Sequence, residues 1–311
     1  MGISSLSISL LLAAVPAPAE PQPIAESVYR TVLESGDLGQ LDAACRDAAR
    51  FGQNERLKAL RDRLMVVAPA PQPFAVVTSN ARALLACRAP ESAQRVLSRY
   101  GPGEGGHRRT WLLLSWRAAA AALDHEAAIL ALRRYADGDL VRLDSVRLQV
   151  GETDAGQPLT RSALDQLADH EAALGRIERA VAVALSGRPT GLEGAERLAQ
   201  VARWQEALGR YDASNLLDAA LDQAAVAEAW ALAEELLKLQ LRLERKAGGD
   251  GARPRARLER LATRVDDRYT LWQLLHHDAP TEATEGRRRE LERQLAAPQP
   301  NPGNTSLKES D

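Results

Sequence analysis

Helical periodicity is the feature of this sequence that most limits its fold. Apolar residues recur at intervals of three and four almost throughout the 311-residue chain, a spacing that places them on one face of a helix. Alanine is abundant and aromatic residues make up only 4% of the chain, which favours closely packed helices because alanine loses no side-chain entropy in a helix. Glycine- and proline-rich stretches interrupt the pattern at residues 36–37, 69–73, 101–106, 187–191 and 248–253. We therefore predict an all-α protein of helices joined by turns.

One short segment departs from the helical period. Residues 146–150 (VRLQV) alternate apolar and polar side chains, as a strand does, and the turn-forming sequence GETDAGQP follows at 151–158. We predict that the region near residues 140–158 is either a small β-hairpin or a loop inserted between helices.

A repeated pentapeptide raises the question of chemistry. DHEAA occurs at residues 124–128 and again at 169–173, and an acid, a histidine and an acid in a row are suited to bind a metal or to transfer protons. Both copies, however, open runs whose apolar residues lie on one helical face. A third run, EALGRYDASNLLDAAL at 206–221, contains a Leu-Gly-x-Tyr-Asp turn. These three runs indicate a repeated turn between helices.

The three runs resemble tetratricopeptide repeats, in which a short turn joins two antiparallel helices and an aromatic residue follows an aspartate. His125 and His170 occupy the position that the aromatic usually fills. The resemblance is clearest over residues 73–262, although the turns are not spaced at the regular period of about 34 residues. It implies a right-handed α-solenoid of helical hairpins, with residues 20–296 as one helical-repeat domain.

The resemblance also implies a function. In such repeats the first helix of each hairpin lines a concave groove, and counting back from the three turns places one set of charged residues on that face. The resemblance thus implies a noncatalytic adaptor or assembly protein that binds a protein segment without a cofactor. Its predicted partner-binding residues are Arg117, Asp165, Arg203 and Glu206.

Two other functions stay open. One is a helical enzyme with a histidine/acid or metal site at the DHE sequences or at His276–Asp278, although the sequence has no HExxH, paired CxxC, GxSxG or phosphate-loop motif. The other is binding of nucleic acid or another anionic partner by residues 242–264, which hold eight basic and three acidic residues. The formal net charge of −2 provides no general attraction to either nucleic acid or an anionic membrane.

The two ends of the chain are predicted to lie outside the helical domain. Residues 3–15 form an uncharged apolar run that leads into Ala17-Pro18-Ala19, a small-residue pattern typical of signal-peptide cleavage before Glu20. We predict a signal peptide at 1–19, no transmembrane segment in the mature chain, and export to a periplasmic, lumenal or secreted location. An uncleaved tail on a cytoplasmic protein is the alternative. Residues 297–311 lack apolar periodicity and are predicted to be a disordered tail.

The two cysteines, Cys45 and Cys87, lie in apolar rows of two separate predicted helices. Two buried thiols are the interpretation we favour, because the sequence does not show that the two Cβ atoms meet. A disulfide is the alternative in an oxidising compartment.

Overall fold

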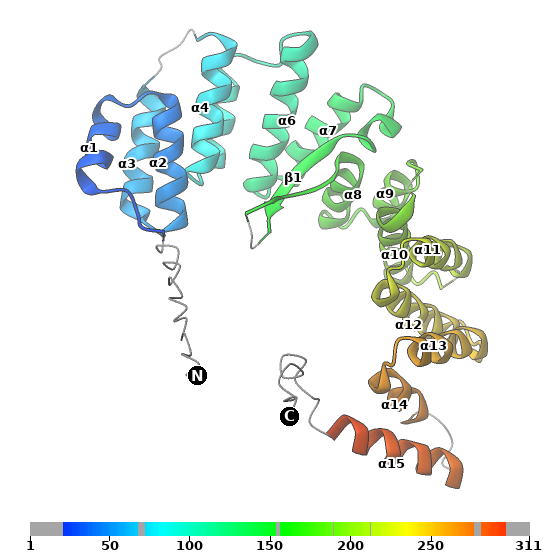
Figure 1. Cartoon of the computed structure of the whole chain (residues 1–311). Helices are drawn as coiled ribbons and strands as arrows, with labels where there is room; N and C mark the ends of the chain where they lie inside the picture. The colour runs from blue at the N-terminus through cyan, green and yellow to red at the C-terminus, as the bar shows by residue number, and fades with distance from the viewer. Residues whose placement is uncertain are drawn as a thin grey trace, which may run out of the picture. The chain divides into compact units, whose positions relative to one another are not determined.

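The computed structural model describes residues 21–67, 72–153, 156–188, 190–211, 213–276 and 281–296. Within these ranges the chain forms fifteen α-helices, one 3-10 helix and one two-stranded sheet, which confirms the predicted all-α, repeat-like fold (Figure 1). None of the helices in these ranges is long and apolar enough to cross a membrane. The chain divides into two compact units, residues 1–114 and 115–311. The predicted signal peptide and C-terminal tail lie outside the described residues.

The first unit is built from the helices α1 (Glu26–Ser35), α2 (Leu38–Arg50), α3 (Asn54–Val66), α4 (Phe74–Ala86), α5 (Pro90–Leu97) and the first part of α6 (Gly105–Ala121). Of these, α1, α3 and α5 end at or just before the predicted interruptions, whereas α2 and α4 end at Arg50 and Ala86, where no interruption was predicted. Asp37 begins α2 with a capping box, because its side chain accepts the N–H of Gln40 and the Gln40 side chain accepts the N–H of Asp37.

A disulfide joins Cys45 to Cys87 within the first unit, with the two Cα atoms 4.6 Å apart. The favoured interpretation of two free thiols is therefore wrong. Cys45 lies on α2 and Cys87 directly follows α4, and these two helices pack against each other although α3 lies between them in sequence. Closing a loop of 42 residues stabilises the folded state by about 4 kcal/mol in the chain-entropy account of disulfides.

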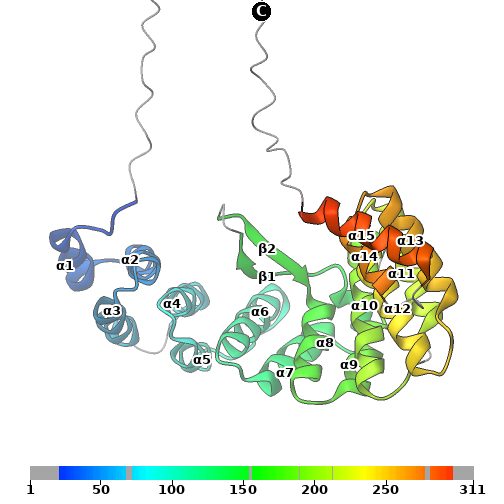
Figure 2. The ribbon, with the colours of Figure 1, turned by 90° about the horizontal axis from the view of Figure 1, so that it is seen from below.

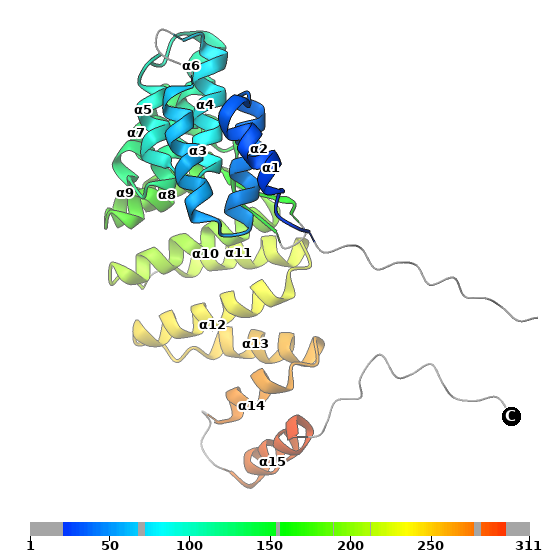
Figure 3. The ribbon, with the colours of Figure 1, turned by 90° about the vertical axis from the view of Figure 1, so that its left-hand side faces the viewer.

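The second unit is a succession of helices interrupted by one hairpin. After the rest of α6 it contains α7 (His125–Ala136), the 3-10 helix η1 (Leu140–Leu143), β1 (Arg147–Glu152), β2 (Pro158–Ser162), α8 (Ala163–Ala173), α9 (Ile177–Ala184), α10 (Gly191–Ala207), α11 (Ser214–Val226), α12 (Trp230–Lys246), α13 (Ala252–Arg264), α14 (Arg268–His276) and α15 (Glu282–Ala296). From α7 to α15 each helix packs against the next one along the chain, and Figure 3 shows α10 to α13 stacked in layers.

Alanine and leucine fill the interior of this stack. The buried residues of α10 and α11 recur every three or four positions, as the sequence pattern requires. Small alanine side chains allow the two helices to approach closely, and leucines fill the remaining space. The residues of this part of the core include Ala195, Ala199, Ala202, Leu217, Ala220 and Ala224, all without solvent exposure.

The region near residues 140–158 forms the hairpin that was one of the two predicted alternatives. β1 and β2 pair antiparallel, with Leu148 opposite Arg161, and the register is interrupted between Gln149 and Gly151. Figure 2 shows both strands beside α6. The hairpin therefore adds a strand edge to an otherwise helical surface.

The two DHE sequences occupy different places in the helical hairpins. The first is an interhelical turn, as predicted, because the side chain of Asp124 caps α7 by accepting the N–H of Ala127. The second lies within α8, and the chain turns only at Gly175, whose φ of +73° suits glycine. The prediction of an interhelical turn at this second DHE sequence is therefore wrong, because α8 continues through it to Ala173.

Candidate functional site

A groove of about 470 Å³ lies between the C-terminal part of α6 and strand β1, entirely within the second unit. It is lined by Trp116, Arg117, Ala120 and Ala121 of α6, residues 149–152 of β1, and Gln166 of α8. The helical wall presents one buried aromatic, two small residues and one exposed cation. Such a wall leaves room for side chains of a ligand and offers a charge beside them.

Strand β1 presents its edge to this groove. Four consecutive residues of the strand, 149–152, border the groove, so a continuous stretch of β1 forms this wall. The other edge of β1 pairs with β2, and no third strand in the described part of the chain pairs with the sheet. An unpaired edge carries backbone N–H and C=O groups that can bond to another extended chain.

Arg117 is the charged residue of the helical wall. Its side chain is exposed, and it makes no hydrogen bond or ion pair with another residue in the part of the chain that the structure describes. Glu152, at the far end of the β1 wall, is also exposed. A guanidinium without an internal partner is free to bind a carboxylate that enters the groove.

The four residues that the resemblance places on one binding surface do not share one environment. Arg117 lines the groove, whereas Asp165 is hydrogen-bonded to Arg197 and only 13% of its side chain is exposed. Arg203 and Glu206 lie on α10 and do not line this groove. The helical frame carried over from tetratricopeptide repeats therefore places one of the four residues, Arg117, in the groove.

Ion pairs join α10 to α12. Arg203 lies 3.5 Å from Glu235, and Glu206 accepts hydrogen bonds from Arg242 at 2.9 Å and Lys246 at 2.7 Å. The hydrogen bonds from these two cations lower the pKa of the Glu206 carboxyl to about 2. Glu206 is therefore engaged in holding two neighbouring helices together.

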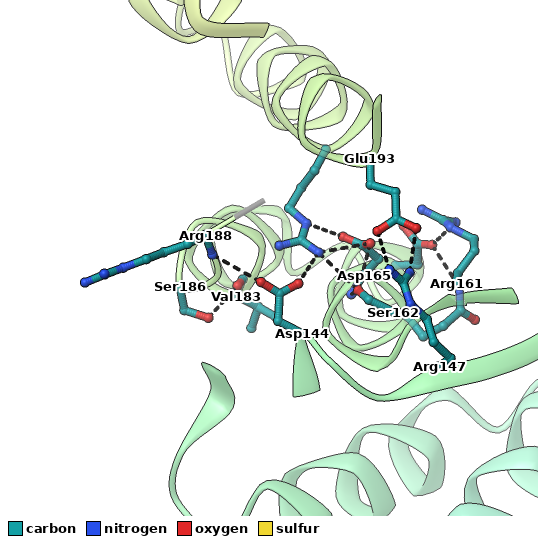
Figure 4. A network of polar contacts seen from close by, with 12 residues as sticks. Asp144, Arg147, Arg161, Ser162, Asp165, Val183, Ser186, Arg188 and Glu193 are labelled. Atoms are coloured by element: carbon teal, nitrogen blue, oxygen red, sulfur yellow. Dashed lines mark hydrogen bonds and ion pairs between the residues drawn. The ribbon is translucent and has the colours of Figure 1, made fainter. Parts of the chain in front are cut away.

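A buried arginine fixes the base of the hairpin. Arg197 of α10 is 5% exposed; its Nε donates to Asp165 at 2.5 Å, and its Nη2 donates to Asp144 at 2.6 Å and to the Ser162 hydroxyl at 3.1 Å. Figure 4 shows Asp144, Ser162 and Asp165 turned toward one another. Asp144 follows η1, Ser162 ends β2 and caps α8, and Asp165 lies in the first turn of α8. One guanidinium therefore connects both ends of the hairpin insertion to α10.

The charges around Arg197 compensate for burial. Burial alone would raise the pKa of Asp144, but the hydrogen bond and charge of Arg197 outweigh it, and the pKa lies below its ordinary value. The backbone at Gly187 passes close to this guanidinium, because a Cβ on Gly187 would lie 2.5 Å from one of the Arg197 nitrogens. Arg147 of β1 adds a bidentate pair with Glu193 of α10, at 2.6 and 2.7 Å (Figure 4). These contacts hold the β1 wall of the groove.

A chain of three rings runs from the groove wall into the interior. The indole Nε1 of Trp116 donates to His170 Nε2 at 3.1 Å, and His170 Nδ1 lies 3.0 Å from His125 Nδ1. Because an indole N–H only donates, His170 Nε2 accepts, so the proton of neutral His170 is on Nδ1 and is donated to His125. Burial, and then the neighbouring His125, lower the pKa of His170 to about 4.

The two DHE sequences therefore meet in space. Besides the histidine contact, Arg176 pairs with Glu126 and lies 3.7 Å from Glu171, and Arg133 donates to the buried Glu171 at 2.6 Å. The sequence analysis did not predict these contacts, because the resemblance assigns both histidines to turns. The repetition of the pentapeptide could have indicated the histidine contact, since identical polar side chains on adjacent helices can bond to one another.

The alternative sites predicted from the sequence are dispersed. No three histidine, cysteine, aspartate or glutamate side chains gather as a potential metal site within the described ranges. His276 ends α14, and residues 277–278 lie outside those ranges. The basic stretch at 242–264 is divided between α12 and α13, where Arg257 pairs with Asp218 at 2.6 Å and Arg264 lies over the Trp230 ring.

Replacing Arg197 by methionine should destabilise the second unit by about 3 kcal/mol, because Asp144 and Asp165 would lose the cation that compensates their partial burial. Urea unfolding followed by circular dichroism measures this loss. Arg289→Met is the matched control, since it removes an exposed arginine paired with Glu285, and should change stability by less than about 0.5 kcal/mol. Equal losses in the two variants would contradict the role given to Arg197.

Acidification should destabilise the second unit through His170. The pKa of His170 is about 4 in the folded protein and about 6.5 in an unfolded chain, so the unfolded chain binds a proton first as the pH falls. The contribution of neutral His170 to the free energy of unfolding is therefore complete above pH 6.5. It decreases by up to about 3 kcal/mol as the pH falls to 4. Urea unfolding at a series of pH values measures this decrease.

The control is His170→Gln, whose amide offers one donor and one acceptor but does not titrate. Its stability should decrease less than that of the parent between pH 6.5 and pH 4. Parallel pH profiles for the parent and the variant would show that His170 does not carry the effect.

No protein-family model and no curated protein matches this chain, so the resemblance to tetratricopeptide repeats stays a prediction.

Proposed function

We propose that this protein is a noncatalytic adaptor or assembly protein whose groove between α6 and β1 binds an extended segment of a partner protein. The observation that carries the proposal is the unpaired edge of β1 across from the Arg117 face of α6. A strand added to this edge satisfies its own backbone groups and those of β1 at the same time.

The lining of the groove indicates which segment fits. Ala120 and Ala121 leave space for apolar side chains of the partner on the α6 wall, which the buried Trp116 backs from below. Arg117 favours an acidic residue at one position of the segment. Backbone pairing is indifferent to sequence, so these α6 residues determine specificity.

A phage-displayed library of random dodecapeptides tests the proposal. Selection on the wild-type protein should enrich peptides that combine apolar residues with an acidic one. Arg117→Glu should lower the affinity for a selected peptide at least tenfold, because it reverses the charge at the wall. Ala120→Trp should abolish binding, because the larger side chain fills the groove. Isothermal titration calorimetry with the synthetic peptide measures both effects.

Arg203→Glu is the matched control, because Arg203 is also exposed on a helix of the second unit but does not line the groove. It should leave the affinity of the selected peptide within about twofold of the parent, a difference below about 0.4 kcal/mol. Failure to enrich any peptide, or equal affinity for the parent and the Arg117 and Ala120 variants, would contradict the proposal.

We also propose that the protein acts after export. The predicted signal peptide at 1–19 supports this location, and so does the Cys45–Cys87 disulfide, because disulfides persist chiefly in oxidising compartments. Protein purified from its native compartment should begin at Glu20 and show no free thiol when unfolded without reductant. Mass spectrometry with thiol alkylation measures both properties. A native chain that retains residues 1–19 and two alkylated cysteines would contradict export.

A further inference from the structure

A second pocket of about 470 Å³ lies between α12, α13 and α14, and none of its residues belongs to the groove. Leu241, Leu258 and Leu274 line it, one from each helix, and each is less than 10% exposed. The same face of α12 contributes a basic row at helical spacing, and α14 adds two polar residues. These polar and basic residues are Lys238, Arg242, Arg245, Lys246, Thr270 and Gln273.

The charge of this pocket is one-sided. Four cations line it and no carboxylate does. Glu234, paired with Lys238, and Glu206, paired with Arg242 and Lys246, neutralise part of this charge from outside the lining. Asp267, which accepts the N–H of the lining residue Thr270, is a third carboxylate close to Lys238, so the four cations outnumber these neighbouring carboxylates by one.

Arg245 is the cation available to a ligand. It is exposed, and within the described ranges it makes no hydrogen bond or ion pair with another residue. Its stem passes close to Gly251, at the start of α13, where an added Cβ would lie 3.5 Å from the Arg245 Cγ. The stem and the Nε of Arg245, which would lie 3.6 Å from the same Cβ, are thereby placed beside the start of α13.

We propose that this pocket binds an aliphatic carboxylate, with the hydrocarbon chain against the three leucines and the carboxylate on Arg245. A planar guanidinium binds a planar carboxylate through two parallel hydrogen bonds. The apolar lining can remove a hydrocarbon chain from water, which stabilises the bound state of an aliphatic ligand. A small hydrophilic anion or a nucleic-acid backbone has no such chain and would gain nothing from the leucines. The pocket volume lies within the range common for small-molecule sites.

Dodecanoate, below its micellar concentration, is the probe that tests this site. Isothermal titration calorimetry with the full chain should detect saturable binding of dodecanoate. Dodecyltrimethylammonium, which has the same chain and the opposite charge, should bind at least tenfold more weakly, and acetate, which has the same charge and no chain, should not bind measurably. These two comparisons separate the contributions of charge and chain.

Two variants assign binding to this pocket. Arg245→Glu and Gln273→Glu each place a negative charge at its lining without changing the leucines, and each should weaken dodecanoate at least tenfold. Arg260→Glu on α13 is the matched control, because Arg260 is exposed, does not line the pocket and undergoes the same charge reversal as Arg245. It should change the affinity less than twofold.

The proposal is overturned if dodecanoate does not bind the parent protein. It is also overturned if the parent, Arg245→Glu and Gln273→Glu proteins bind dodecanoate with equal affinity. Equal affinity for dodecanoate and dodecyltrimethylammonium would show nonspecific hydrophobic association and overturn it as well. Peptide binding in the α6–β1 groove uses other residues, so its success or failure is read separately.

Discussion

The β1–β2 hairpin, which interrupts the helical stack of the second unit, depends on the hydrogen bonds and ion pairs of the buried Arg197 guanidinium. Helices satisfy their own backbone hydrogen bonds, whereas a two-stranded hairpin is marginally stable alone and needs support from its surroundings. Arg197 supplies that support by bonding to Asp144 before the hairpin and to Ser162 and Asp165 after it. Because the charge is buried, each carboxylate is needed to offset its desolvation. The position of β1, and hence the groove, follows from this network.

The repeated DHEAA sequence has a structural role with a chemical consequence. His125 and His170 come from adjacent helices and bond to each other, and Trp116 fixes which nitrogen of His170 accepts. That chain is complete only while His170 is neutral, since a proton on Nε2 would face the indole N–H. The low pKa of His170 and the expected loss of stability in acid are thus two consequences of the same packing.

The sequence predicts local structure here better than it predicts contacts. Helical spacing, the glycines and the alternation at 146–150 indicated the helices, several of the turns, and the hairpin as one of two alternatives, because each depends on neighbouring residues. The disulfide and the Arg197 network were not predictable in this way, since they join residues that are 42 and 53 positions apart. The second DHE turn was misplaced because its alanine-rich surroundings suit a helix interior as well as a turn. Counting along one helix selected Arg117, which lines the α6–β1 groove, whereas the β1 wall opposite could be seen only from the fold.

The α6–β1 groove and the pocket between α12, α13 and α14 offer different chemical groups to a ligand. A groove formed only by helices offers side chains, because its backbone groups are already bonded within each helix. Placing β1 opposite α6 adds the backbone donors and acceptors of an unpaired strand edge to a wall that otherwise offers only side chains. The pocket between α12 and α14 has no strand edge and must recognise its ligand through leucines and cations. This difference is the physical reason why we propose an extended peptide for the groove, where the hairpin supplies a strand edge, and a compact amphiphilic anion for the other pocket, where no strand is present.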